Sequence, residues 1–199
     1  PAMSTAFSML QIFNAALVSQ GQDSVDDNDN SNEWALLSQN WPLIVEAELE
    51  DGAYDFVRKQ HFLQSRVVGK FGFADGYLVP LTAMFVRQLW IDGASGSRTA
   101  IPWSQDGTNV YVDEDAGVYV EVVEVVEPDI WGANFCRGIQ LKLEAVICRA
   151  LKEESGEAAR LEAQAEVHFD RARTKSSKSR SATEPYRSGR LTAARFARG

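Results

Sequence analysis

Apolar residues recur at helical spacing in two segments near the start of the chain. Between Ser4 and Gln20 they share one helical face, and Ser4 and Gly21 are residue types that begin and end helices. A second helix is expected after an acidic loop, where Asn30 and Glu33 have the spacing of a capping box. Its apolar stripe consists of Trp34, Leu37, Trp41, Ile44 and Ala47.

One proline and two tryptophans in this second helix can each be interpreted in two ways. Pro42 lies inside the apolar pattern, and because proline lacks a backbone N–H it predicts a kink or a division of the helix. Trp34 and Trp41 lie seven residues apart on one face. They are candidates either for core packing or for a platform on which bases stack, and the helical stripe favours packing.

The period of the pattern changes in the middle of the chain. From Tyr54 to Trp90 short apolar stretches are broken by glycines and Pro80, which is typical of strands. Further strands are expected over 100–103, 109–112 and 117–126, with the last two joined as a hairpin.

The last of these strands changes its apolar face. Val118, Val120 and Val122 share one face, whereas Val123 and Val125 share the other. A strand keeps its faces unless a residue is inserted, so the pattern predicts a β-bulge between Val122 and Val123.

Helical periodicity returns after Pro128. A third helix is expected from about Ala133 to Leu151, and a fourth one capped by Ser155. The residues of the fourth helix expected to face inward are Ala158, Leu161, Ala165 and Phe169. From Lys175 onward the apolar periodicity is lost, and we expect an extended segment there.

Together these elements predict an α+β fold, a bundle of about four helices with an inserted small antiparallel β subdomain and an extended C-terminal arm. The expected divisions are 1–53 and 129–174 for the bundle, 54–128 for the β insertion and 175–199 for the arm. Cys136 and Cys148 stand twelve residues apart in the third helix. Their separation of about 18 Å excludes a disulfide within that helix.

The formal net charge of −8 divides unevenly along the chain. Residues 1–170 hold 27 acidic and 11 basic side chains, whereas residues 171–199 hold nine basic side chains and only Glu184. In this basic segment, apolar and aromatic residues alternate with arginines: Tyr186, Arg187, Arg190, Leu191, Arg195, Phe196 and Arg198. Such a segment is suited to an acidic protein surface or, as the alternative, to nucleic acid phosphates.

Patterns for catalysis and metal binding are weak. The loop Asp26–Asn30 begins like a calcium-binding loop, but Ser31 and Leu37 stand where glycine and glutamate are required, which favours a plain solvated loop. His61 and His168 lack neighbouring ligands at metal spacing, and no nucleophile elbow accompanies them. A hydrolase using either histidine is therefore the weakest alternative.

The trio Asp113, Glu114 and Asp115 is a candidate cation site, although an exposed hairpin tip is favoured. No phosphate-binding or dinucleotide-binding loop is present, and no pattern typical of a resident metal site stands out. The apolar runs are shorter than the ~18 residues of a membrane-spanning helix, and no signal peptide is legible. We therefore expect no membrane association.

Five short motifs occur along residues 5–175 in an order that resembles one known family. They are Asn14-Ala15-Ala16-Leu17, Gly52-Ala53-Tyr54-Asp55-Phe56-Val57, Gly76-Tyr77-Leu78-Val79-Pro80-Leu81, Pro128-Asp129-Ile130-Trp131 followed by Phe135, and the Leu143–Leu151 run. This order is similar to that of the tail tubular protein A family, the head-to-tail adaptors of short-tailed bacteriophages.

The resemblance implies a structural virion protein without cofactor or reaction. Such adaptors form a dodecameric ring beneath the portal protein, assembled in the host cytoplasm, and join it to the tail nozzle, tail tubular protein B. DNA passes through the ring without sequence-specific binding. The helical part generally faces the portal and neighbouring subunits, and the β part faces the tail.

Two candidate sites follow from this resemblance. The arm residues named above would contact the portal, and Asp113, Glu114 and Asp115 would contact the nozzle. A nucleic-acid-binding protein that uses the arginine-rich segment remains the alternative function.

Overall fold

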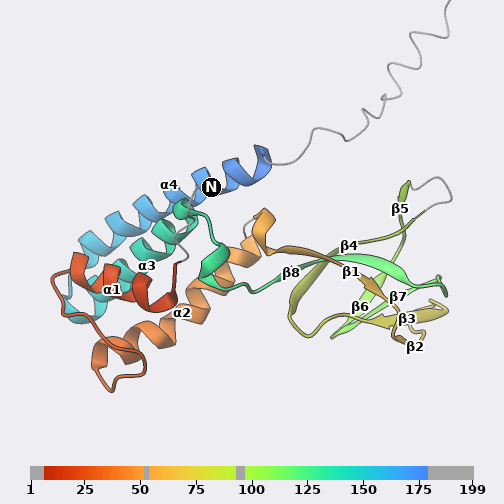
Figure 1. The fold of residues 1–199 in the computed structure, drawn as a ribbon, viewed down its shortest axis with the longest axis horizontal. Helices are drawn as coiled ribbons and strands as arrows, with labels where there is room; N and C mark the ends of the chain where they lie inside the picture. The colour runs from red at the N-terminus through yellow and green to blue at the C-terminus, as the bar shows by residue number, and fades with distance from the viewer. Residues whose placement is uncertain (1–6, 52–53, 93–96, 179–199) are drawn as a thin grey trace, which may run out of the picture.

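The computed structural model describes residues 7–51, 54–92 and 97–178. The molecule is elongated, with four helices at one end and two antiparallel sheets at the other (Figure 1). We call residues 7–51 and 133–178 the helical part, residues 58–124 the sheet part, and residues 54–57 and 125–132, which connect them, the neck. This is the α+β fold predicted from the sequence, with the sheets inserted between two helical pairs.

Helix α1 (Met9–Ser19) begins later than predicted. Its N-cap is Ser8 rather than Ser4, and the Ser8 and Gln11 side chains form a capping box with the backbone. Ser4 lies outside the described residues. The predicted end is confirmed, because Gly21 has a φ of +73° and the Gln22 N–H donates to the Leu17 carbonyl, as in a Schellman motif.

Helix α2 (Asn32–Asp51) begins at a different cap from the predicted one. The Ser31 hydroxyl, not the Asn30 side chain, accepts the backbone N–H of Trp34. The Asp29 carboxylate in turn accepts the hydroxyl and the N–H of Ser31, and these two hydrogen bonds lower the pKa of Asp29. The helix runs through Pro42 without a division.

Helix α3 (Ala133–Leu151) has the predicted bounds, and α4 (Ser155–Lys178) packs along it. Gly138 permits their close approach, since a Cβ there would lie 2.4 Å from the Phe169 ring. The inward residues predicted for α4 are all buried. The expected end at Lys175 is wrong, however, because the helix continues to Lys178; an amphipathic face that reaches Ala172 supports this additional turn.

The sheet part consists of eight short strands. Sheet one has the order β1-β8-β4-β5 and sheet two the order β2-β3-β7-β6. The strands are β1 (Arg58–Leu63), β2 (Arg66–Val68), β3 (Asp75–Leu78), β4 (Ala83–Asp92), β5 (Arg98–Ala100), β6 (Ser104–Asp106), β7 (Asn109–Val112) and β8 (Val118–Glu124). The strand predicted over 100–103 is therefore replaced by two strands that flank it.

The predicted hairpin between β7 and β8 is wrong. β7 pairs with β3 and β6, whereas β8 pairs with β1 and β4, so residues 113–117 cross from one sheet to the other. The crossing allows β7 and β8 both to turn valines into the space between the sheets, which a hairpin within one sheet would not do. Val110, Val112, Val118 and Val120 accordingly lie in one buried cluster.

The predicted bulge at Val122 and Val123 is also wrong. β8 pairs with β1 in continuous register, and the irregular positions lie in the partner strand β4, between Ala83 and Phe85 and between Val86 and Gln88. Val122 and Val123 are both buried because the strand is covered on two sides there. Val122 belongs to the core between the sheets, and Val123 to the core of the helical part.

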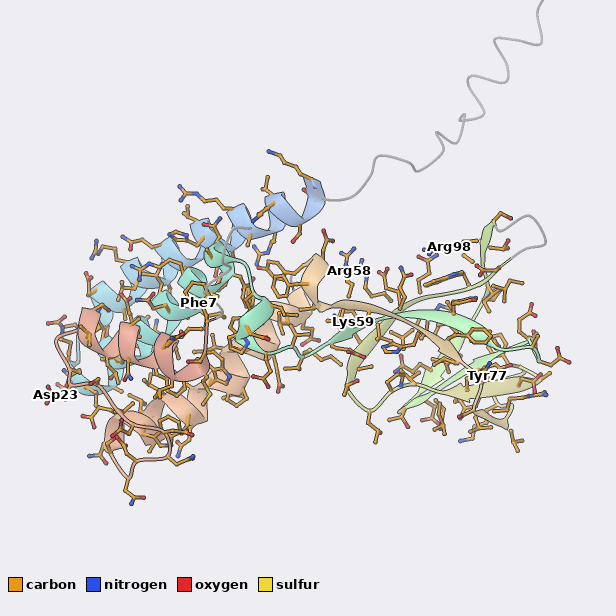
Figure 2. The ribbon with its side chains drawn as sticks, viewed as in Figure 1. Phe7, Asp23, Arg58, Lys59, Tyr77 and Arg98 are labelled. Carbon is orange, nitrogen blue, oxygen red and sulfur yellow. The ribbon has the colours of Figure 1, made fainter. Side chains whose placement is uncertain are left out.

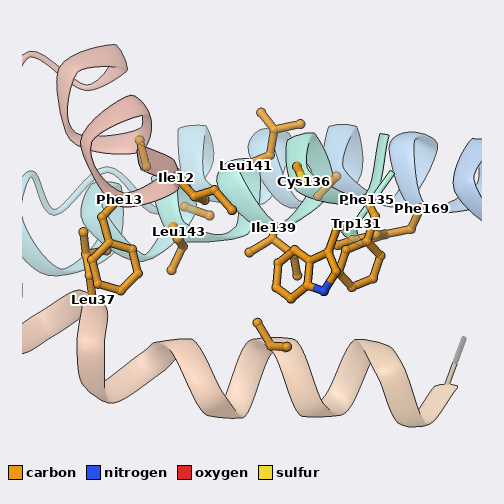
Figure 3. Close-up of a cluster of buried hydrophobic side chains, with 14 of the residues drawn as sticks. Ile12, Phe13, Leu37, Trp131, Phe135, Cys136, Ile139, Leu141, Leu143 and Phe169 are labelled. Atoms are coloured by element: carbon orange, nitrogen blue, oxygen red, sulfur yellow. The ribbon is translucent and has the colours of Figure 1, made fainter. Parts of the chain in front are cut away.

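Aromatic rings fill the core of the helical part (Figure 3). Phe13 meets Trp34 and Trp41 edge-on at ring-centroid distances of 5.6 and 5.4 Å. Trp41 stacks on Trp131 at 5.5 Å, and Trp131 meets Phe135 at 4.8 Å. The prediction that Trp34 and Trp41 serve core packing is confirmed, as is the position of Trp131 where the sheets lead into α3.

Candidate interaction sites

The acidic trio lies on the crossing between the two sheets. Tyr77, which is buried in β3, donates its hydroxyl to the Glu114 carbonyl at 2.7 Å and accepts the Gly117 N–H at 3.0 Å. The crossing is thus held at Glu114 and at Gly117 by one phenol, at the position that Figure 2 labels. The Tyr77 hydroxyl therefore fixes the second half of the acidic segment, from Glu114 to Gly117.

The carboxylates of the trio do not converge. Asp113 accepts the backbone N–H of Ala74 at 2.9 Å and so ties the crossing to the turn before β3. Asp115 is exposed and lies near the Arg66–Asp75 ion pair, since its charge contributes to raising the pKa of Arg66, after Asp75 itself. Among the described residues no group of three acidic, His or Cys side chains has a metal-binding arrangement. The three residues of the trio therefore do not form a cation cage, and the Asp113 and Asp115 side chains are exposed.

The arm residues from Tyr186 to Arg198 lie outside the described residues. The structure describes the end of α4, after which this segment follows. Lys175 and Lys178 are exposed in the last two turns of α4, so the positive charge of the segment begins on this helix.

A partly buried ion pair holds this end of α4 against α2. Arg173 of α4 donates to Glu48 of α2 at 2.7 Å, and Tyr54 in the neck donates its hydroxyl to the same carboxylate. Burial raises the pKa of Glu48 above its ordinary value, against the opposing effects of Tyr54 and Arg173. Burial and Glu48 together raise the pKa of Tyr54, which stays a neutral donor.

Sequence reasoning missed this network. Glu48 stands in a run of alternating acidic residues that has the appearance of a solvated helix face, and its partner is 125 residues away. The only available signal was the phase of the helix, because Glu48 falls on the same face as Leu37 and Trp41.

A second buried charge lies next to the neck, on the first residue of β1. The Arg58 side chain is only 10% exposed, and its Nη1 atom lies 4.0 Å from the Asp55 carboxylate. Its Nε and Nη2 atoms are buried without a hydrogen-bond partner in the described part of the chain. Arg58 and Lys59 lie where the neck leads into β1 (Figure 2), so the buried cation stands at the junction of the helical part and the sheet part.

Neither histidine is arranged for hydrolysis. The His61 Nε2 atom lies 2.8 Å from Glu124 Oε1, and the Thr82 hydroxyl donates to that same oxygen rather than to the imidazole. A catalytic histidine takes its proton from the nucleophile, which this order of contacts does not provide. His168 contacts the Asn134 side-chain oxygen at 3.3 Å, and burial lowers its pKa.

The two cysteines are free and buried, as their spacing predicted. Burial raises the pKa of the Cys136 thiol to about 11, so almost none of it is thiolate at neutral pH. Over the residues that the structure describes, none of the helices is long and apolar enough to span a membrane.

Comparison with known protein families gives no match, and no curated protein sequence matches the chain.

Proposed function

We propose that this chain is a structural head-to-tail adaptor of a short-tailed bacteriophage, which forms a ring under the portal vertex and joins it to the tail nozzle. The observation that carries the proposal is the order of the five motifs that resemble tail tubular protein A, together with the two-ended shape. Helices occupy one end of the molecule and sheets the other (Figure 1). A subunit that joins two different partners needs two different ends.

The ion pair between Arg173 and Glu48 supports the role proposed for the C-terminal segment. It fixes the end of α4 against α2, so that the segment after Lys178 continues from an anchored base at the neck. A tether of this kind transmits a load to the folded part instead of unravelling the helix from which it extends. The arginines and aromatic residues beyond this base then dock on acidic grooves of the portal.

Charge supports a passage for DNA. Residues 1–170 have a net charge of −16, from 27 acidic and 11 basic side chains. A ring built from such bodies repels phosphates and offers the duplex little that it can bind, so DNA slides through. The acidic crossing at Asp113–Asp115 is the part of the sheet end proposed to contact the nozzle.

The test is assembly on particles of the cognate portal protein. The full chain is expected to form rings on these particles, visible in negative-stain images, and deletion of residues 185–199 is expected to reduce occupancy. A matched variant that replaces Arg187, Arg190, Arg195 and Arg198 by lysine keeps the charge and removes the planar guanidinium groups. Unchanged occupancy after the deletion would refute the role of the arm, and absence of rings with the intact chain would refute the function.

The alternative function is tested on the same proteins. A nucleic-acid-binding protein would bind duplex DNA with an affinity that falls steeply with salt and depends on residues 171–199. Filter binding at two salt concentrations measures this. The adaptor proposal predicts weak DNA binding by the full chain, since the acidic body opposes the basic segment.

A further inference from the structure

The outer face of α2 is acidic and has an exposed apolar centre. Leu43 is 70% exposed there, and Glu46 and Glu50 follow it at helical spacing on the same face, opposite the buried Leu37 and Val45. Neither carboxylate takes part in an ion pair within the described residues. The surrounding sequence is acidic too, because residues 1–57 contain ten acidic side chains and no lysine or arginine.

The outer face of α4 has the complementary character. Val167 is 49% exposed, and Arg171 and Lys175 follow it on the side opposite the buried Ala165, Phe169 and Ala172. Neither of these two cations has an ion-pair partner within the described part of the chain. Both outer faces therefore present an apolar residue followed by unpaired charge, negative on α2 and positive on α4. The face of α4 also exposes Asp170, whose charge is paired with Arg173.

The two faces lie on opposite sides of the helical part. In Figure 1, α3 lies between α2 and α4, and both outer helices run in the same direction, toward the sheets. A single molecule therefore cannot bring its own two outer faces together. Two copies can do so in a head-to-tail arrangement, which closes into a ring when the rotation between copies is suitable.

The ion pair between Glu48 and Arg173 fixes the levels of the two faces. The Arg173 Nη2 and Glu48 Oε1 atoms lie 2.7 Å apart, so these two residues stand at roughly the same height along the two helices, to within the reach of their side chains. Glu46 and Arg171 each lie two residues before this contact, and Glu50 and Lys175 each lie two residues after it. At ~1.5 Å per residue the members of each pair have nearly the same height.

The apolar residues match as well. Leu43 lies five residues before Glu48, or about 7.5 Å, and Val167 lies six residues before Arg173, or about 9 Å. A rotation about an axis parallel to the helices changes no heights. Such a rotation therefore brings the apolar residue and both charges of α2 to the level of their counterparts on the neighbouring α4.

We propose that the outer face of α2 in one copy binds the outer face of α4 in the next, with Glu46 on Arg171, Glu50 on Lys175 and Leu43 against Val167. The partner is a second copy of this chain, and the contact supplies the lateral joint of the ring, so it rests on the proposed adaptor function. The internal pair between Glu48 and Arg173 sets the register of the external pairs.

The decisive experiment is a disulfide between copies. The full chain with both Glu46→Cys and Arg171→Cys is oxidised in concentrated solution and on portal particles, then run on a non-reducing gel. A ladder of covalent multimers is expected, because every copy donates one thiol in each direction. Cys136 and Cys148 are buried and serve as the background in the unmodified chain.

Two matched variants define the register. Glu46→Cys combined with Arg160→Cys places the second thiol on the same α4 face, about 16 Å nearer to its start, and should give no ladder. Glu46→Cys alone should give no crosslink. Dimers from that single variant would instead show that two α2 faces meet, which would overturn the proposal, as would equal ladders from the two double variants.

Charge reversal gives a second test that does not depend on cysteines. Glu46→Arg with Glu50→Arg, and Arg171→Glu with Lys175→Glu, should each abolish oligomers measured by sedimentation. Mixing the two proteins should restore oligomers in which the two variants alternate, because every joint between unlike variants again brings opposite charges together. Portal binding that proceeds without the ladder would refute this contact and leave the adaptor function standing. A ladder without portal binding would support the contact and refute the function.

Discussion

The helical part and the sheet part form their cores from different side chains. Rings dominate the helical core, where Phe135 alone contacts Tyr54, Phe56, Trp131 and Phe169. Valines dominate the core between the sheets. Large rings have few packing solutions and specify how helices cross, whereas β-branched side chains suit a pleated surface without specifying which strand lies opposite. The valine-rich core therefore contains no side chain that identifies the partner of each strand, and the strand pairing was not predictable from it.

The largest loss of stability is expected from removal of an aromatic ring from the core of the helical part. Phe135→Ala should reduce the free energy of unfolding by about 3–5 kcal/mol, since it leaves a cavity among four rings. Urea unfolding followed by tryptophan fluorescence measures this. Val18→Ala, at a position 62% exposed on α1, should change it by less than about 0.5 kcal/mol. Equal effects of the two substitutions would show that the rings do not carry the packing.

The ion pair between Arg173 and Glu48 is tested by Arg173→Met, with Arg160→Met as its control. Both arginines contact an acidic residue three positions earlier on α4, but only Arg173 also meets the buried Glu48. Arg173→Met should reduce the free energy of unfolding, measured with urea, by about 2–3 kcal/mol at neutral pH, because it leaves the Glu48 carboxylate without its cation. The control should cost well under 1 kcal/mol.

The stability lost on Arg173→Met should also depend on pH. The pKa of Glu48 is raised in the folded state, so the folded chain binds the proton more tightly, and stability falls as pH rises from the unfolded to the folded pKa. Removing Arg173 raises that pKa further and enlarges the fall. Unfolding measured at pH 5 and pH 7.5 should therefore show a smaller difference from the unmodified chain at pH 5; an equal or larger one would contradict the assignment.

A matched pair on β8 separates the two cores. Val122→Ala and Val123→Ala remove the same atoms from adjacent buried residues, and each should cost about 1–2 kcal/mol. Hydrogen exchange should become faster in the sheets for the first variant and in the helical part for the second, because the residues belong to different clusters. The same exchange pattern in both variants would show that the cores unfold as one unit.

The smallest effect is expected at the acidic crossing. Tyr77→Phe removes the hydroxyl that contacts Glu114 and Gly117 and should cost about 1 kcal/mol. The Gly117 amide should exchange faster while amides in the helical part remain unchanged. If Gly117 keeps its protection, the phenol does not hold the crossing.

Features were predictable from the sequence where the residues that determine them are close together along the chain. The bounds of α3 were predictable, because an apolar stripe and a preceding proline are local signals, as was the Gly21 stop of α1. The bulge at Val122 was predicted wrongly because two successive buried valines look like a change of face when only one core is considered. The Glu48–Arg173 pair joins distant segments and has no local signature.

The candidate sites divide in the same way. Asp113–Asp115 was placed correctly between two strands, but the sequence did not show that these strands belong to different sheets. The matching heights of Glu46 and Arg171 require the packing of α2 and α4, so no reading of either helix alone would have paired them.

The two chain segments that join the parts of the molecule are hydrogen-bonded to each other. β1 enters the sheets from α2 and β8 leaves toward α3, and they pair side by side with Arg58 opposite Val123. β8 is also bonded along its other edge to β4. A tension between the two parts pulls β1 and β8 in the same direction, so their mutual bonds are not strained, and the row of bonds from β8 to β4 is loaded in shear. Bonds loaded in shear must break together rather than one after another. A neck built in this way can carry mechanical stress from one end to the other without a thick waist.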